Sequence, residues 1–164
     1  MENASRALMM AAGVLIGLMI LSLAVYLITS FGSASAEAHR TNEQNRINEF
    51  NTQFTQYEGR QDITIHDIVT VVNLARSNNE TYDLDAQTSN NSNYYITVNA
   101  KIASGGNKPN MQKLKTEDLN EIVTNEISTL SEGSSNLPLY SCTVLISPIT
   151  ERVYQVDFQP ITWY

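Results

Sequence analysis

The feature that most constrains this chain is a run of twenty-two residues without a charged side chain, residues 7–28 (ALMMAAGVLIGLMILSLAVYLI). As an α-helix rising about 1.5 Å per residue, the run would be about 33 Å long, which matches the hydrocarbon thickness of a bilayer. A helix in a soluble core is rarely apolar on every face over this length. The run therefore predicts a membrane-spanning helix whose partner is lipid.

Two interpretations exist for the fate of this segment. Residues 33–36 (SASA) precede Glu37 and offer an Ala-x-Ala step of the kind that signal peptidase cleaves. However, the apolar run is longer than the apolar core of a signal peptide, which has roughly 7–15 residues, and Arg6 is the one basic side chain before the run. We therefore expect a retained anchor. The alternative is a secreted monomeric binding domain released by cleavage near Ala36.

The flanking charges give little orientation, because Arg6 on one side of the run is balanced by Arg40 and Arg46 on the other. The segment before the run is very short, whereas the polar bulk after it is acidic and rich in Asn and Thr. We expect a single-pass protein of the cell membrane with its amino terminus inside and its C-terminal domain outside.

Charge and composition narrow the function. With 17 acidic and 10 basic residues the formal charge is −7, which disfavours a nucleic-acid partner because phosphates require a basic surface. A lone cysteine, Cys142, excludes an intrachain disulfide and a multi-thiolate zinc site. No nucleophile elbow, metalloprotease, Walker or dinucleotide motif occurs. The sequence therefore predicts a protein without catalytic activity, metal or cofactor. In the secreted alternative, the loops at residues 89–93 and 105–110 are expected to contact a ligand.

Small residues mark one face of the apolar run. Gly13 and Gly17 form a Gly-x-x-x-Gly pair, and Ala24 lies further along the same face. Small side chains let a second helix approach closely in lipid. This face is the predicted site of helix association, either with a second copy or with another envelope subunit.

The polar stretch after the run, residues 37–58, carries one narrow apolar stripe. Its members recur at helical spacing, and they are Ile47, Phe50, Phe54 and Tyr57. We expect the membrane helix to continue through this stretch as a stalk, with a bend near Gly32. The stripe is a seam for one partner, either the globular part of this chain or a neighbouring subunit, and the first use is the more common.

Gly59 is predicted to end the stalk helix by supplying a left-handed residue. Beyond it, capping and periodicity predict helices that begin at Thr64 and Thr116. Alternation predicts strands over residues 82–86, 94–102, 140–146 and 153–158. The expected fold is α+β, with the order α-β-β-α-β-β and an antiparallel sheet. The predicted divisions are a tail and anchor at 1–36, a stalk at 37–58, and an extracytoplasmic domain at 59–164.

This organisation resembles that of type IV pilin-like proteins, through the short polar start at residues 1–7 (MENASRA), the apolar helix, the polar stalk and the α+β head. Residues 50–59 (FNTQFTQYEG) also resemble uncharacterised single-pass proteins of Gram-positive bacteria. Pilin-like proteins carry a glutamate inside the apolar segment, whereas Glu2 precedes it here, so no processing residue is carried over. The resemblance implies a structural or interaction subunit of a cell-envelope or pilus-like assembly.

Overall fold

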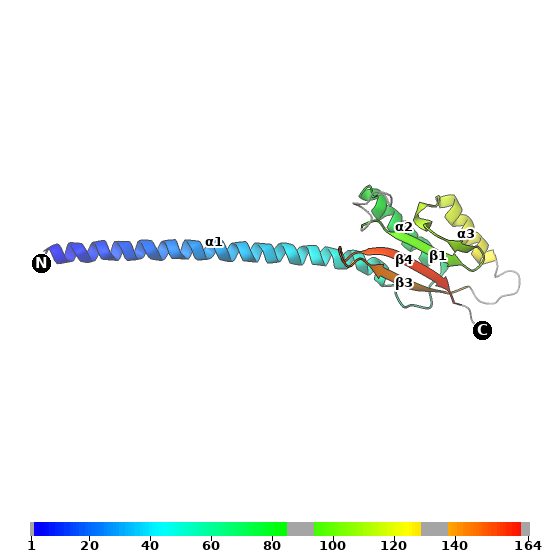
Figure 1. The fold of residues 1–164 in the computed structure, drawn as a ribbon, viewed down its shortest axis with the longest axis horizontal. Helices are drawn as coiled ribbons and strands as arrows, with labels where there is room; N and C mark the ends of the chain where they lie inside the picture. The colour runs from blue at the N-terminus through cyan, green and yellow to red at the C-terminus, as the bar shows by residue number, and fades with distance from the viewer. Residues whose placement is uncertain (1, 85–93, 129–137, 162–164) are drawn as a thin grey trace. The chain divides into compact units, whose positions relative to one another are not determined.

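The structure, a computed structural model, describes residues 2–84, 94–128 and 138–161. Its elements are α1 (Glu2–Thr55), α2 (Ile65–Thr81), β1 (Thr97–Ile102), β2 (Gly106–Lys108), the 3-10 helix η1 (Met111–Lys113), α3 (Thr116–Ser128), β3 (Tyr140–Ile146) and β4 (Val153–Pro160), as drawn in Figure 1. The chain divides into two compact units, Met1–Arg46 and Ile47–Tyr164.

The first unit is helical throughout its described length. Helix α1 passes from the apolar run into the polar stretch without a break, so the predicted continuation is confirmed. Gly32 and Ser33, where a bend was expected, have helical backbone. Within the described part of the chain, none of residues 2–46 is buried, and Ser30 alone among them is half-buried.

In the second unit, α2 begins where the sequence predicts. The Thr64 hydroxyl accepts a hydrogen bond from the Asp67 amide, and the Asp67 carboxylate accepts one from the Thr64 amide at 2.9 Å. This reciprocal pair satisfies two backbone donors that a helix start leaves without partners. The buried face of the helix follows its period and consists of Ile65, Ile68, Val71, Val72 and Ala75.

The α+β class is confirmed, but the sheet is mixed and not antiparallel. The strand order is β2-β1-β4-β3; β1 pairs with β2 and β4 with β3 in antiparallel fashion, whereas β1 and β4 run parallel. Alternation reveals which face of a strand is buried, but it carries no information about which strand lies beside it or in which direction. The prediction of an antiparallel sheet was wrong because it required the direction of neighbouring strands, which alternation does not give.

The first predicted strand, residues 82–86, is also wrong in its described part. Tyr82 and Asp83 form a turn after α2, and Asp83 takes a left-handed backbone with φ of 49°. The amides of Tyr82 and Leu84 donate to the carbonyls of Asn78 and Asn79, so these residues cap the helix. Residues 85 and 86 lie outside the described part. The predicted pair consisted of strands 82–86 and 94–102. In the structure β1 pairs instead with β2, which lies in a stretch predicted to be a loop.

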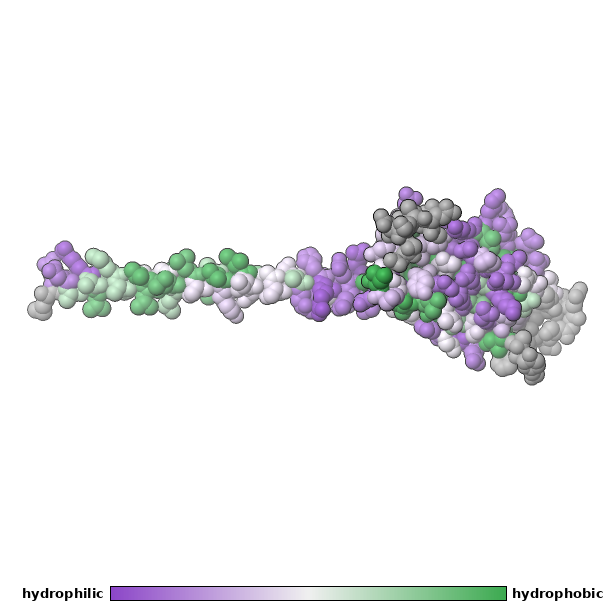
Figure 2. Space-filling view, viewed as in Figure 1, coloured by the Kyte–Doolittle hydropathy of each residue, from purple (hydrophilic) through white to green (hydrophobic). Residues whose placement is uncertain are grey.

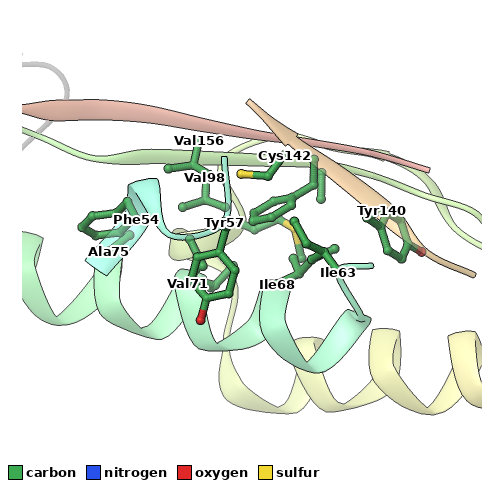
Figure 3. Close-up of a cluster of buried hydrophobic side chains, with 14 of the residues drawn as sticks. Phe54, Tyr57, Ile63, Ile68, Val71, Ala75, Val98, Tyr140, Cys142 and Val156 are labelled. Carbon is green, nitrogen blue, oxygen red and sulfur yellow. The ribbon is translucent and has the colours of Figure 1, made fainter. Parts of the chain in front are cut away.

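The core lies between the sheet and the helices (Figure 3). Strand residues Val98, Cys142 and Val156 point from one layer toward Val71 and Ile68 of α2 in the other. The opposite face of the sheet is lined by partly or fully exposed side chains, among them Asn99, Thr143, Gln155 and Asp157. One face is therefore packed and the other is polar, as expected for a sheet covered by helices on one side only.

The end of α1 belongs to this core. Phe54 is 1% exposed and Tyr57 is 9% exposed, and Phe50 packs against the same cluster from the side. The compact unit therefore begins at Ile47, twelve residues before the domain boundary expected at Gly59. Gly59 itself has the predicted left-handed backbone, with φ of 71°.

We expect a fragment of residues 47–164 to unfold cooperatively, and a fragment of residues 59–164 to be strongly destabilised. The shorter fragment lacks Phe54, and loss of a buried phenylalanine side chain costs about 3–5 kcal/mol. Circular dichroism during heating checks this. In the longer fragment, Phe54→Ala should reproduce most of the loss, while the exposed neighbour Gln53→Ala should change stability by less than about 0.5 kcal/mol. Equal melting of the two fragments would remove α1 from the core.

Candidate functional site: the exposed apolar surface of α1

The largest apolar surface of the described chain lies on α1 (Figure 2). We call it the anchor surface; its exposed large side chains are Leu8, Met9, Met10, Val14, Leu15, Ile16, Leu18, Met19, Ile20, Leu21, Leu23, Val25, Tyr26, Leu27, Ile28 and Phe31. They occupy every side of the helix, and none of the most apolar eighteen-residue window is buried. A surface of this size in water would be a strong aggregation site.

Two polar side chains within this apolar stretch of α1 have partners in the helix itself. The Ser22 hydroxyl donates to the carbonyl of Met19 at 2.9 Å, and the Thr29 hydroxyl donates to the carbonyls of Val25 and Tyr26. An unsatisfied polar group in hydrocarbon is costly, so these internal bonds lower the cost of placing Ser22 and Thr29 in lipid.

The predicted association residues lie on this helix as well. A Cβ atom placed on Gly13 or Gly17 would meet no other atom within 4 Å, so the helix backbone is open there. Ala24 is likewise exposed. The structure contains one chain and brings none of the three to a partner.

The predicted seam has a different environment. Of its four members Phe54 and Tyr57 are buried, while Ile47 and Phe50 are half-buried. The Arg152 guanidinium lies 4.0 Å from the centre of the Phe50 ring, and the Phe54 ring is 5.4 Å from the Phe50 ring. The stripe thus packs against the domain of its own chain, the first of the two uses considered for it.

A buried glutamate that was not predicted from the sequence organises the turn between β1 and β2. Glu126 of α3 is fully buried and accepts hydrogen bonds from the amides of Ala103 and Ser104, at 3.2 and 3.0 Å. The Ser104 and Tyr140 hydroxyls also bond to it. Burial, together with the bond to Glu126, raises the pKa of Tyr140, so its hydroxyl stays protonated. The burial of Glu126 could have been predicted from its spacing, because it lies seven residues after Leu119 on the apolar stripe of α3.

This carboxylate changes the interpretation of the loop at residues 105–110. Two of the amides in the adjoining turn, those of Ala103 and Ser104, already donate to side-chain oxygens of Glu126. The turn is therefore a structural joint between the sheet and α3. The other loop considered for ligand contact, residues 89–93, lies outside the described residues.

The described residues with reactive side chains do not converge. Cys142 is buried on β3, where burial raises the pKa of its thiol to about 12, and the nearby carboxylates of Glu58 and Asp157 add to the effect. His66 is exposed on α2. Within residues 2–84, 94–128 and 138–161, no group of three or more His, Cys, Asp or Glu side chains is placed to hold a metal ion.

A groove of about 670 Å³ runs between the end of α2 and the start of α3. Its lining carries both signs of charge, with Arg76, Lys113 and Lys115 on one side of the balance and Glu80, Asp83 and Glu117 on the other. The Arg76 guanidinium is already engaged, since it donates to the carbonyls of Gln112 and Leu114. Arg76 thus joins α2 to η1 and to Leu114 after it. The mixed charges of the lining favour neither an anion nor a cation.

Comparisons with protein families, with curated proteins and with solved structures find no match to this chain. The resemblance to pilin-like proteins therefore rests on architecture alone, namely a long N-terminal apolar helix followed by a small mixed α/β domain.

We expect Glu126→Gln to destabilise the domain by on the order of 2–3 kcal/mol, because the new amide would turn a donor toward donors that need an acceptor. Tyr140→Phe, which removes one donor, should cost about 1–2 kcal/mol. Urea unfolding followed by circular dichroism measures both. The matched control is Glu121→Gln, an exposed residue of the same helix, with a change below about 0.5 kcal/mol. Equal effects at the two glutamates would contradict a structural role for Glu126.

Proposed function

We propose that this chain is a single-pass, membrane-anchored structural or interaction subunit of a cell-envelope or pilus-like assembly, without catalytic activity. The observation that carries the proposal is the anchor surface, which is apolar on all sides of α1 and contacts nothing else in the described chain. Each large apolar side chain left in water costs about 1.5–3 kcal/mol relative to burial. Lipid is the environment that removes this cost for all sides of one helix at once.

The domain that follows supports an interaction role over an enzymatic one. Two of its buried polar groups, Glu126 and Tyr140, bond to each other and to backbone amides, and neither lines the groove between α2 and α3. Its exposed sheet face is polar, and its single thiol is buried in the core. We infer that the domain acts through its surface, outside the cytoplasmic membrane.

Replacing Leu18 and Leu21 with Arg should abolish stable membrane insertion. Each arginine near the centre of the span costs about 2.5–3.5 kcal/mol on the insertion scale, so the pair costs about 5–7 kcal/mol. The measurement is the fraction of full-length chain that stays with membranes after carbonate extraction. The double change to Ile is the control and should extract like the parent chain. A parent chain found solely as a soluble product that begins at Glu37, with no full-length chain in the membrane fraction, would favour the secreted alternative.

The same membranes give the orientation. Ser5→Cys and Thr124→Cys place thiols before the anchor surface and on exposed α3, and a membrane-impermeant maleimide applied to intact cells should label the second alone. Burial keeps the background from Cys142 low. Labelling at Ser5→Cys alone would reverse the proposed orientation.

We further propose that the anchors associate through Gly13, Gly17 and Ala24, in homo-oligomers or with other envelope subunits. Changing Gly13 and Gly17 to Leu should weaken association by on the order of 1–2 kcal/mol, because bulky side chains separate the helix backbones. Cross-linking in native membranes measures the oligomer. Leu15→Ile with Met19→Leu, on the other side of the helix, is the control. An unchanged oligomer would exclude this face, and a monomeric parent would contradict the subunit proposal.

A further inference from the structure

The stretch that joins the anchor surface to the domain has little besides its own backbone to keep it helical. We call residues 29–38 (TSFGSASAEA) the release segment. All of its residues are exposed except the half-buried Ser30, and a Cβ atom added to Gly32 would meet nothing within 4 Å. Five of the ten residues are glycine, serine or threonine, which are among the weaker helix formers, and all five lie at positions 29–35, whereas the stronger formers alanine and glutamate lie at positions 34 and 36–38. The five are exposed or half-buried, so burial does not compensate for their weak propensity.

The side chains of the segment add to this weakness. The hydroxyls of Thr29 and Ser33 donate to carbonyls one turn earlier, an arrangement that competes with the backbone hydrogen bonds of the helix. The next turn is better held, because Arg40 and Glu37 form an ion pair at 3.3 Å. Local opening of α1 should therefore be easiest between residues 29 and 36.

Opening of this segment would leave both neighbouring parts intact. The part of the anchor surface before it, Leu8 to Ile28, would stay in lipid, and the core contacts of α1 begin only at Phe50. Ten residues also lengthen from about 15 Å as a helix to about 33 Å when extended. The opened chain would thus carry Ala36 away from the bilayer surface, where a protease could bind it in the extended form.

We propose that the release segment is a cleavage site for an endopeptidase with pockets for small side chains, which would free the folded domain from its anchor. Ala34 and Ala36 supply small residues at alternate positions before the scissile Ala36–Glu37 bond. Hydrolysis consumes one water and leaves a carboxylate on Ala36 and an amine on Glu37. This proposal rests on the proposed membrane anchorage, and it concerns the inserted protein rather than a signal peptide removed during export.

The test uses the full-length chain in phospholipid vesicles with an elastase-type protease, whose primary pocket accepts small side chains. Domain released into the supernatant is timed and weighed by mass spectrometry. We expect fragments that begin between residues 33 and 38 and retain the parent's thermal transition. Gly32→Ala combined with Ser33→Ala and Ser35→Ala should slow release by roughly tenfold to thirtyfold, because it strengthens the helix while adding residues that the protease prefers.

The control is Thr41→Ala with Asn42→Ala and Asn45→Ala, which alters the same helix beyond the release segment and should change the rate by less than about threefold. Fragments that begin within residues 41–46, or release that is unchanged or faster in the first variant, would overturn the proposal. Failure of the membrane proposal looks different, since the uncut chain would then be found in the supernatant before protease is added.

Discussion

The domain depends on the burial of the last turns of α1. Phe54 lies inside the core, and Asn51 one turn earlier holds the connection between β3 and β4. The side-chain nitrogen of Asn51 donates to the carbonyl of Glu151 at 2.7 Å, and its side-chain oxygen accepts a hydrogen bond from the backbone amide of Val153 at 3.0 Å. The helix therefore supplies both apolar volume and hydrogen bonds to the sheet. The same continuous helix carries the anchor surface, so one part of α1 is apolar and exposed and its last turns are packed in the core of the domain.

Side-chain amides complete the sheet where strands are missing. Strand β2 has three residues and pairs with β1 only from Ala100 onward. On that side, the Asn79 side chain bonds both the amide and the carbonyl of Ile96, and the Gln112 side chain accepts from the amide of Val98. These bonds occupy backbone groups that would otherwise offer an edge to another chain. The domain is thereby protected against strand-to-strand aggregation at this edge.

The sequence predicted those features that a local pattern determines. The capping box at Thr64 and the left-handed Gly59 follow from chemistry within a few residues. The direction of β1 relative to β4 could not be predicted in this way, because it depends on residues more than fifty positions apart. The turn at Tyr82 was mistaken for a strand because an aromatic residue between polar ones also suits a helix end whose amides bond back to the last turn.

The candidate site shows the same division between local and distant information. The anchor surface was predictable because lipid imposes one requirement on every face of a helix, and composition alone reveals whether it is met. The role of Glu126 was not, although its place on an apolar stripe marked it as unusual: its partners, Ser104 and Tyr140, come from distant parts of the chain. The seam was recognised as a contact surface, but periodicity could not say whether the contact lay within the chain.

The distribution of apolar residues along α1 provides the strongest link from sequence to function. In the anchor surface they occupy all sides, in residues 37–46 they are nearly absent, and from Ile47 they return on one side only. These three patterns are the ones expected of a helix in lipid, in water and against a protein core, because each environment tolerates a different exposed surface. The uncharged apolar run takes up 22 of the 164 residues, and the described reactive groups do not converge, which agrees with the proposed role of holding a folded surface at a membrane.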